Sequence, residues 1–252
     1  MSENAFHLAG DLIAPLTGLY YTHALAALHD RLRPRTYLEI GVDRGETLRL
    51  ARCASIAVDP NMQITQDIVG EKPVCLLFQS TSDDFFARHE PSLLLDGPID
   101  FAFLDGMHWY EFLLRDFANT ERFCQRNSVI ALHDCVPTDV FMARRDRWDE
   151  AQRRLAPTPA SWTGDVWKTL ILLRRHRPDL HIECFNAAGT GLVLITHLDP
   201  ASRVITERYD AMVAEVTSLN LRAYGLQRYA DELNLRDASL LANTQEVARR
   251  FR

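Results

Sequence analysis

The stretch Thr36-Tyr-Leu-Glu-Ile-Gly-Val-Asp-Arg-Gly-Glu-Thr47 decides the fold. It is typical of an apolar strand that runs into an acidic residue, two spaced glycines and the start of a helix. A second short strand, Ser55–Val58, ends on Asp59, twenty residues after Glu39. A βαβ unit places an acid at this distance to meet the hydroxyl pair of a ribose. The sequence therefore predicts a pocket for a nucleoside cofactor.

The glycine spacing narrows the kind of cofactor. Three residues separate Gly41 from Gly45, and no third glycine follows. A dinucleotide fingerprint uses a third glycine for close helix packing, and here Asp43 and Glu46 place negative charge where a pyrophosphate would sit. A cofactor without phosphate is favoured over a nicotinamide dinucleotide. The alternative is a plain strand–turn–helix connection in which Gly41 is only a turn residue.

The pattern Glu39-x-Gly41-x-x-x-Gly45, with Asp59 after the next strand, resembles motif I and the acidic loop of the class I S-adenosylmethionine-dependent methyltransferases. The resemblance implies that Glu39, Gly41 and Gly45 hold the methionine part of the cofactor and that Asp59 holds the ribose. By the same resemblance, Ser82 in the following loop contacts the adenine.

Short apolar runs separated by amphipathic helical segments favour a parallel sheet covered on both faces. The expected parallel strands are Tyr37–Ile40, Ser55–Val58, Val74–Phe78, Ile99–Leu104 and Ser128–Leu132. A helix over residues 165–176 and a hairpin of Leu180–Phe185 and Gly191–Thr196 follow. We expect an α/β fold with a doubly wound, seven-stranded, mostly parallel sheet of the Rossmann-like methyltransferase type.

The chain divides into three parts by pattern. We expect a mostly helical N-terminal segment over 1–33, a methyltransferase domain over 34–200 with a substrate-covering insertion at 137–164, and two or three polar helices over 201–252. Apolar positions in the last part, such as Ile205 and Met212, suit a lid, a homo-oligomer contact or simple packing on the same domain.

Composition excludes several classes of function. A formal charge of −6 and a pI near 5.8 give no electrostatic footprint for nucleic acid or membrane. Five cysteines without close pairing argue against a disulfide framework and a structural zinc site. With no signal-peptide layout and no long apolar run, we expect a cytoplasmic protein that acts on small molecules.

Acidic and imidazole side chains follow the fourth and fifth strands. Asp105 ends one strand and His133-Asp134 ends the next. In an open parallel sheet, ligands bind at these carboxyl ends, and neighbouring strands lie about 4.8 Å apart. A divalent cation would relieve the repulsion between the two carboxylates and bind a hydroxylated substrate. The alternative is that Asp105 caps a helix and Asp134 ends its strand in a turn.

A second resemblance supports the metal. It is carried by two segments, Phe103-Leu-Asp-Gly-Met-His-Trp-Tyr110 with Asp116, and Leu132-His-Asp134. Together they look like the metal-dependent O-methyltransferase branch related to catechol O-methyltransferase, and within it the bacterial macrolide-sugar O-methyltransferases. The resemblance implies Asp105, His133 and Asp134 as metal ligands, Asp105 beside the cofactor as well, and His108 as the general base. The catechol enzymes carry a lysine at the base position and an Asp-Asn pair after strand five, so the acceptor stays open.

The metal is expected to be Mg²⁺ on availability, although a histidine ligand favours Mn²⁺ or another transition ion. An imidazole suits the base because it is half-deprotonated near neutral pH; the alternative for His108 is a surface or capping histidine. Tyr110, Trp167 and Lys168 are candidates for acceptor contacts, unless Asp165 is a helix cap and the tryptophans serve only as packing.

These expectations combine into one function: an S-adenosylmethionine-dependent O-methyltransferase that uses a divalent metal and acts on a hydroxylated small molecule, such as a sugar unit or a secondary metabolite. Three alternatives stay open. They are a metal-independent methyltransferase of the same fold acting on nitrogen, carbon or a carboxylate, a nicotinamide-dependent oxidoreductase, and a non-catalytic binding protein that uses its C-terminal helices.

Overall fold

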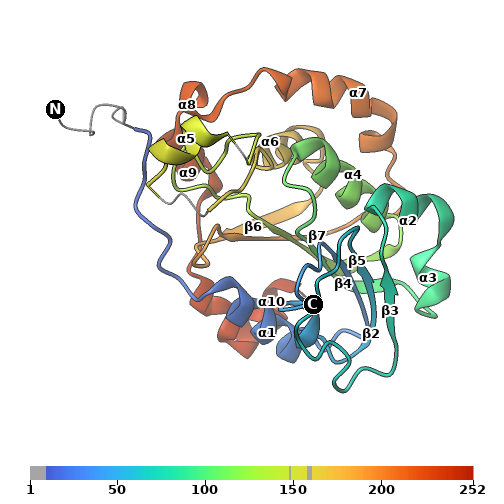
Figure 1. The fold of residues 1–252 in the computed structure, drawn as a ribbon. Coiled ribbons are helices and arrows are strands. Elements are labelled where there is room, and N and C mark those ends of the chain that lie inside the picture. Colours follow the sequence, from blue (N-terminus) through green and yellow to red (C-terminus); the bar gives the residue numbers. More distant parts are fainter. Residues whose placement is uncertain (1–9, 148, 158–160, 252) are drawn as a thin grey trace.

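The computed structural model describes residues 10–147, 149–157 and 161–251, and a seven-stranded sheet forms its centre (Figure 1). The strand order is β3-β2-β1-β4-β5-β7-β6. The strands are β1 (Thr36–Ile40), β2 (Ala54–Val58), β3 (Cys75–Phe78), β4 (Ile99–Leu104), β5 (Cys124–His133), β6 (His181–Phe185) and β7 (Leu192–Thr196). Pairing is parallel except that β7 runs antiparallel to both β5 and β6. The predicted fold class is confirmed.

The central strands are buried on both faces. In β4, Phe101 and Phe103 pack on one face and Ala102 and Leu104 on the other, all 0% exposed. Continuous apolar runs of this kind are typical of parallel strands covered by helices on both sides. The register pairs Leu104 of β4 with Leu132 of β5, so the residues that follow these two strands emerge side by side.

The connections on the β1 side differ from the expectation. The helix predicted after Gly45 is absent: only a three-residue 3₁₀ turn, η1 (Leu48–Leu50), separates β1 from β2, and no helix lies between β2 and β3. Gly41, Asp43 and Gly45 have φ values of 87°, 43° and 82°. A chain that returns to the left-handed region at every second residue cannot continue as an α-helix.

Helices from the two ends of the described chain cover this face instead. They are α1 (Tyr21–Leu32), η2 (Ala238–Ala242) and α10 (Thr244–Phe251). Leu25, Leu28, Leu241 and Phe251 belong to the same apolar cluster as the β4 phenylalanines. Figure 1 shows α1 and α10 together below the sheet. Residues 10–20 are not helical, which corrects the mostly helical N-terminal segment within its described part.

The opposite face carries the remaining helices. They are α2 (Ser82–Arg88), α3 (Pro91–Leu94), α4 (Tyr110–Glu121), α6 (Trp167–His176), α7 (Val204–Thr217), α8 (Leu221–Tyr224) and α9 (Leu226–Leu233). Ile205, Met212 and Val216 of α7 are buried in the apolar cluster on this face. The apolar stripe of the C-terminal part therefore packs on its own domain. The predicted insertion 137–164 contains the short α5 (Glu150–Leu155), and its residues 148 and 158–160 lie outside the described residues, as do 1–9 and 252 of the terminal segments.

All five cysteines are free thiols, and four of them are buried. This agrees with the absence of a disulfide framework expected from their number and spacing. Among the helices of the described residues, none combines the length and the apolar character that crossing a bilayer requires.

We predict that the terminal helices contribute to stability as core elements. Leu25→Ala removes a side chain that is 1% exposed and should lower the free energy of unfolding by about 2 to 5 kcal/mol, because it leaves a cavity under the sheet. Chemical denaturation measures this change. Leu93→Ala, at a leucine that is 77% exposed, is the matched control and should change stability by about 0.5 kcal/mol or less. Equal effects of the two substitutions would contradict the packing described here.

Candidate active site

The carboxyl ends of β4 and β5 bring two carboxylates and two imidazoles together. His108 Nε2 lies 3.4 Å from Asp105 Oδ1 and 3.1 Å from Asp134 Oδ2. His133 Nδ1 lies 3.3 Å from Asp105 Oδ2 and 3.6 Å from Asp134 Oδ1. Four residues predicted from the sequence thus meet in one site. The ligand atoms of Asp105, His108 and Asp134 all fall within 4.8 Å of one another.

The orientation of His108 is set by the end of the predicted insertion. Its Nδ1 lies 2.9 Å from the carbonyl oxygen of Trp162, and the two rings stack with centroids 4.7 Å apart. Because a carbonyl can only accept, Nδ1 must carry the proton, and the Nε2 lone pair of the neutral ring faces the two carboxylates. Gly164, with φ of 59°, lies against the His108 backbone; a Cβ there would sit 1.7 Å from the His108 carbonyl oxygen.

His133 is held by a second set of contacts. Its ring packs against Tyr21, the first residue of α1, with centroids 4.1 Å apart and the ring planes tilted by 34°. The Thr190 hydroxyl donates to Asp134 Oδ1 and lies 3.4 Å from His133 Nε2. This network assigns the His133 proton to Nε2, so the Nδ1 lone pair of a neutral ring also faces the carboxylates.

Charge balance explains the protonation of this group. Burial disfavours the charged ring of His108, but the carboxylates of Asp134 and Asp105 outweigh burial and raise the pKa of His108 to about 9. Burial likewise opposes protonation of His133, yet the same two carboxylates hold its pKa well above the ordinary value. Burial alone would raise the pKa of Asp105, but the two imidazolium groups lower it below its usual range.

Three of these residues, Asp105, His108 and Asp134, have ligand atoms close enough together to hold a metal ion, whereas His133, which the sequence predicted as a ligand, is not in this group. Asp105 Oδ1 and His133 Nδ1 are buried and accept or donate no hydrogen bond within the described part of the chain. Two carboxylates with the His108 imidazole lone pair form a mixed oxygen and nitrogen donor set of the kind that binds divalent transition ions. Asp134 has a φ of 58°, a left-handed conformation that aspartate adopts more readily than most residues. It turns the carboxylate back toward the end of β4.

The glycine loop after β1 lies beside this centre. Gly41 packs on the backbone after β4, where a Cβ would sit 2.0 Å from the Asp105 carbonyl oxygen, and Gly45 packs on Ile68, where a Cβ would sit 2.5 Å from Cγ2. Both glycines also have positive φ. Any side chain would therefore be excluded twice, by space and by backbone conformation.

The two acids predicted to bind the cofactor also hold this loop. Asp59 Oδ2 accepts from the backbone N–H of Val42 at 2.8 Å and of Asp43 at 2.9 Å. Glu39 is fully buried under the loop, where Oε2 accepts from Tyr37 at 2.6 Å and Oε1 from Thr47 at 2.8 Å. Burial raises the pKa of Glu39 to about 8, although these two hydrogen bonds lower it in part. Contact of either acid with a ligand stays a prediction.

The predicted acceptor residues do not gather at the centre. Tyr110 is buried, and its hydroxyl donates to the Val213 carbonyl 3.0 Å away in α7. Trp167 is buried against Tyr229, whose ring centroid lies 5.3 Å from its own.

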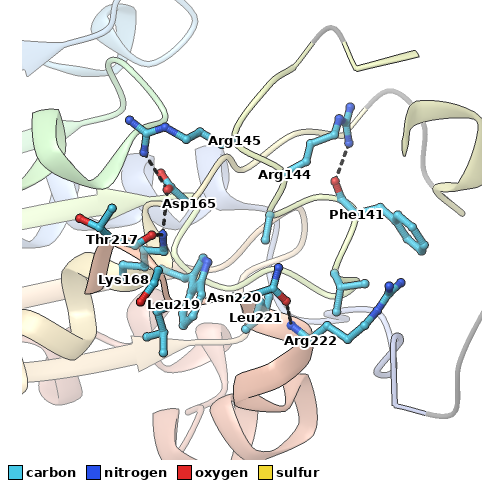
Figure 2. Close-up of a pocket in the computed structure, with 14 residues that line it drawn as sticks. Phe141, Arg144, Arg145, Asp165, Lys168, Thr217, Leu219, Asn220, Leu221 and Arg222 are labelled. Carbon is cyan, nitrogen blue, oxygen red and sulfur yellow. Dashed lines mark hydrogen bonds and ion pairs between the residues drawn. The ribbon is translucent and has the colours of Figure 1, made fainter. Parts of the chain in front are cut away.

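Lys168 lines a separate cavity of about 560 Å³. Figure 2 shows Lys168 and Arg145 directed at the same carboxylate of Asp165, at 3.2 Å and 2.8 Å. The other oxygen of Asp165 accepts from the Tyr110 N–H at the start of α4. Asp165 therefore caps α4 rather than its own helix.

Two positioning residues were not found from the sequence. Trp162 fixes His108 from the far end of the insertion, and Thr190 fixes His133 from the turn between β6 and β7. The topology could have indicated Thr190, because the turn of a hairpin paired to β5 must lie over the carboxyl end of that strand. A lone tryptophan in a long connection carries no comparable signal.

Comparison with known proteins agrees with this geometry. Residues 38–135 match a protein family described as a methyltransferase domain. This match makes residues 38–135, less than half of the chain, similar to a methyltransferase domain. The matched range begins in β1 and ends just after Asp134, so it includes the glycine loop and all four residues of the centre. No curated protein sequence matches the chain.

Solved structures share the fold of this methyltransferase domain. The cofactor-bound protein Rv0187 from MTB superposes with a TM-score of 0.53 at 16% identity, over 75% of this chain and 84% of that one. The O-methyltransferase from Bacillus cereus in complex with SAH gives a TM-score of 0.51 at 12% identity, over 76% and 86% of the two chains. At these identities the likeness establishes the fold.

The raised pKa of His108 predicts a pH-dependent contribution to stability in the metal-free protein. The pKa of His108 is about 9 in the folded state and 6.5 ordinarily. The stabilisation that results from this shift is complete below pH 6.5 and is lost as the pH rises through 9. The difference in unfolding free energy between wild type and His108→Gln should fall by about 3 kcal/mol between pH 6 and pH 10. Denaturation with a chelator present measures it, with the exposed His23→Gln as control. A difference that is the same at both pH values would show that His108 is not held as an imidazolium.

Proposed function

We propose that the protein is an S-adenosylmethionine-dependent, divalent-metal-assisted O-methyltransferase that acts on a hydroxylated small molecule, such as a sugar unit or a secondary metabolite. The observation that carries this proposal is the convergence of Asp105, His108, His133 and Asp134 beside the glycine loop of a methyltransferase domain. The O-methyltransferase from Bacillus cereus with bound SAH, which shares the fold, adds support from a relative.

The cofactor has a defined place in this proposal. The methionine part lies along the loop of Gly41 and Gly45, whose missing side chains let the loop pack directly on the Asp105 backbone and on Ile68. The ribose hydroxyls lie at Asp59, whose carboxylate retains acceptor capacity although it already accepts from the N–H groups of Val42, Asp43 and Asn61. The methyl group then faces the ends of β4 and β5.

The reaction needs an acceptor hydroxyl that loses its proton as it attacks. The acceptor oxygen forms a bond to the methyl carbon, the carbon–sulfur bond breaks, and its electron pair stays on sulfur. His108 supports the proton transfer when its ring is neutral, because Trp162 holds its Nδ1–H and leaves the Nε2 lone pair to take the hydroxyl proton. The carboxylates alone raise the pKa of His108 to about 9, so this role needs a bound cation to neutralise them.

A bound divalent cation would supply positive charge that acidifies the acceptor hydroxyl and neutralises Asp105 and Asp134. In this proposal Asp105, His133 and Asp134 hold the cation. His108 Nε2 lies about as near to the two carboxylates as His133 Nδ1 does. Two roles are therefore open to His108, metal ligand and general base. The expected ion is Mg²⁺ on availability. The nitrogen donors instead favour Mn²⁺ or another transition ion.

The two histidines should respond differently to metal. Chelation should abolish turnover while SAH (S-adenosylhomocysteine) binding persists. His108→Ala should lower turnover by about 100- to 10,000-fold at every metal concentration, because a lost base cannot be replaced by metal. His133→Ala should weaken metal binding and regain part of its rate as metal is added. The measurement is the rate of each variant across a titration with Mg²⁺ or Mn²⁺.

Two outcomes would change this assignment. Rescue of His108→Ala but not of His133→Ala would make His108 the ligand and reverse the two roles. Full activity after exhaustive chelation, with negligible metal content confirmed, would favour a metal-independent methyltransferase.

We predict that Asp59 contributes to cofactor affinity. Asp59→Ala should weaken binding of SAH by about 1.5 to 3 kcal/mol, the usual loss for hydrogen bonds to a charged group. Calorimetry measures the affinity. Glu71→Ala, which removes a carboxylate that is 81% exposed in the connection between β2 and β3, is the control and should bind as wild type does. Unchanged affinity of Asp59→Ala would remove Asp59 from the cofactor site.

A further inference from the structure

The cavity that contains Lys168 is lined by four cationic side chains and one carboxylate, that of Asp165. It has a volume of about 560 Å³ and lies between the insertion, the start of α6 and the segment that joins α7 to α8. Figure 2 shows Arg145 and Lys168 on one side of it, opposite Arg144 and Arg222. In a chain with a formal net charge of −6, such an excess of positive charge in one cavity favours a negatively charged ligand.

The carboxylate in the wall is already compensated. Asp165 Oδ1 accepts from the N–H of Tyr110, and Oδ2 lies 3.2 Å from Lys168 Nζ and 2.8 Å from Arg145 Nη1. Two cations thus share one carboxylate. Lys168 Nζ also donates to the Thr217 carbonyl oxygen at 3.3 Å. Because an ammonium group carries three N–H donors, Lys168 keeps one for a ligand.

The arginines keep donors as well. Arg145 also pairs with Glu111, and Arg222 pairs with Asp11, but neither of these two carboxylates lines the cavity. Arg222 uses Nε and Nη2 for Asp11, and its Nη1 donates to no residue in the described part of the chain. Arg145 uses its two terminal nitrogens, and its Nε donates to none of the described residues. A guanidinium group has five N–H donors, so each arginine has some left over.

The rim of the cavity is open to solvent. Ser218, Asn220 and Arg222 line it and are exposed. The side-chain oxygen of Asn220 accepts from the backbone N–H groups of Arg222 and Ala223. This assigns the oxygen to the start of α8 and leaves the amide N–H₂ group as a further donor at the rim. A small molecule that enters from solvent therefore meets hydrogen-bond donors from three segments of the chain.

Apolar side chains form much of the remaining wall, namely those of Phe141, Trp167, Leu219 and Leu221. The volume of about 560 Å³ falls within the range of sites for small organic ligands, about 300 to 1,000 Å³, and is far larger than a bare inorganic anion needs. A ligand that matches this wall combines one anionic group with an apolar body.

We propose that this cavity is a binding site for a small organic anion. Its carboxylate or phosphate group accepts hydrogen bonds from Lys168, Arg145 and Arg222, and its apolar part packs on the aromatic and leucine side chains of the wall. The site is separate from the catalytic centre, because none of the four residues of that centre lines the cavity. The inference therefore stands whether or not the protein transfers a methyl group.

The test titrates the full chain with phenyl phosphate and with benzoate in a calorimeter. Both carry an apolar ring and differ in the anionic group, so the one that binds more tightly identifies that group. Wild type should bind it at one site, at least tenfold more tightly than benzyl alcohol, which is neutral, and than inorganic phosphate, which lacks the ring. Binding of neither anion, or equal binding of benzyl alcohol or inorganic phosphate, would overturn the inference.

Two substitutions locate the bound anion. Arg222→Gln removes a cation from the rim, and Ser218→Asp adds a carboxylate at an exposed position of the wall; each should weaken binding at least tenfold. Arg33→Gln, at an exposed arginine that lines two other cavities, is the control and should keep the wild-type affinity. Ser218→Asp decides the question if Arg222→Gln does not fold. Full affinity in Ser218→Asp, or an equal loss in Arg33→Gln, would place the anion elsewhere and contradict the proposed site.

Discussion

The structure depends on balancing two carboxylates that the sheet brings side by side. The parallel register of β4 and β5 delivers Asp105 and Asp134 to the same edge, and ionised carboxylates so close repel each other strongly at low dielectric. Positive charge must therefore reach this point from the imidazoles or from a bound cation. Trp162 contacts His108, and Thr190 and Tyr21 contact His133. These contacts keep the two imidazoles facing the carboxylates.

The two halves of the sheet prepare the site by different means. On the β1 side the backbone dominates, because Gly41 and Gly45 let the loop pack against the Asp105 backbone and Ile68 and Asp59 ties the loop through N–H groups. On the β4 side, side chains dominate, and their supports come from distant segments. Gly41 joins the halves, since its contact with the Asp105 carbonyl oxygen sets the loop against the cluster of carboxylates and imidazoles.

Local pattern predicted the strands and the doubly wound, mostly parallel sheet that they form. It also predicted the four residues of the centre, because the carboxyl ends of parallel strands must lie at one edge of the sheet. The absent helix after Gly45 was missed, since nothing in the local pattern shows that α1 and α10 already occupy that face. The burial of Tyr110 was also missed, and the pattern left Trp167 open between acceptor contact and packing. An aromatic residue near a predicted pocket has the same local signature whether it lines the pocket or packs behind it, and only the tertiary contacts with α7 and α9 decide.

The cover provided by α1, η2 and α10 has a consequence for the order of folding. During synthesis α1 emerges before any strand, yet its packing partners Leu241 and Phe251 emerge more than two hundred residues later. Contacts of such long sequence separation form slowly, and one face of the sheet stays without its full cover until they form. A nascent chain in this state exposes the apolar surface that chaperones recognise. Closure of the fold, and with it the seating of Tyr21 on His133, then belongs to the last events of folding rather than the first.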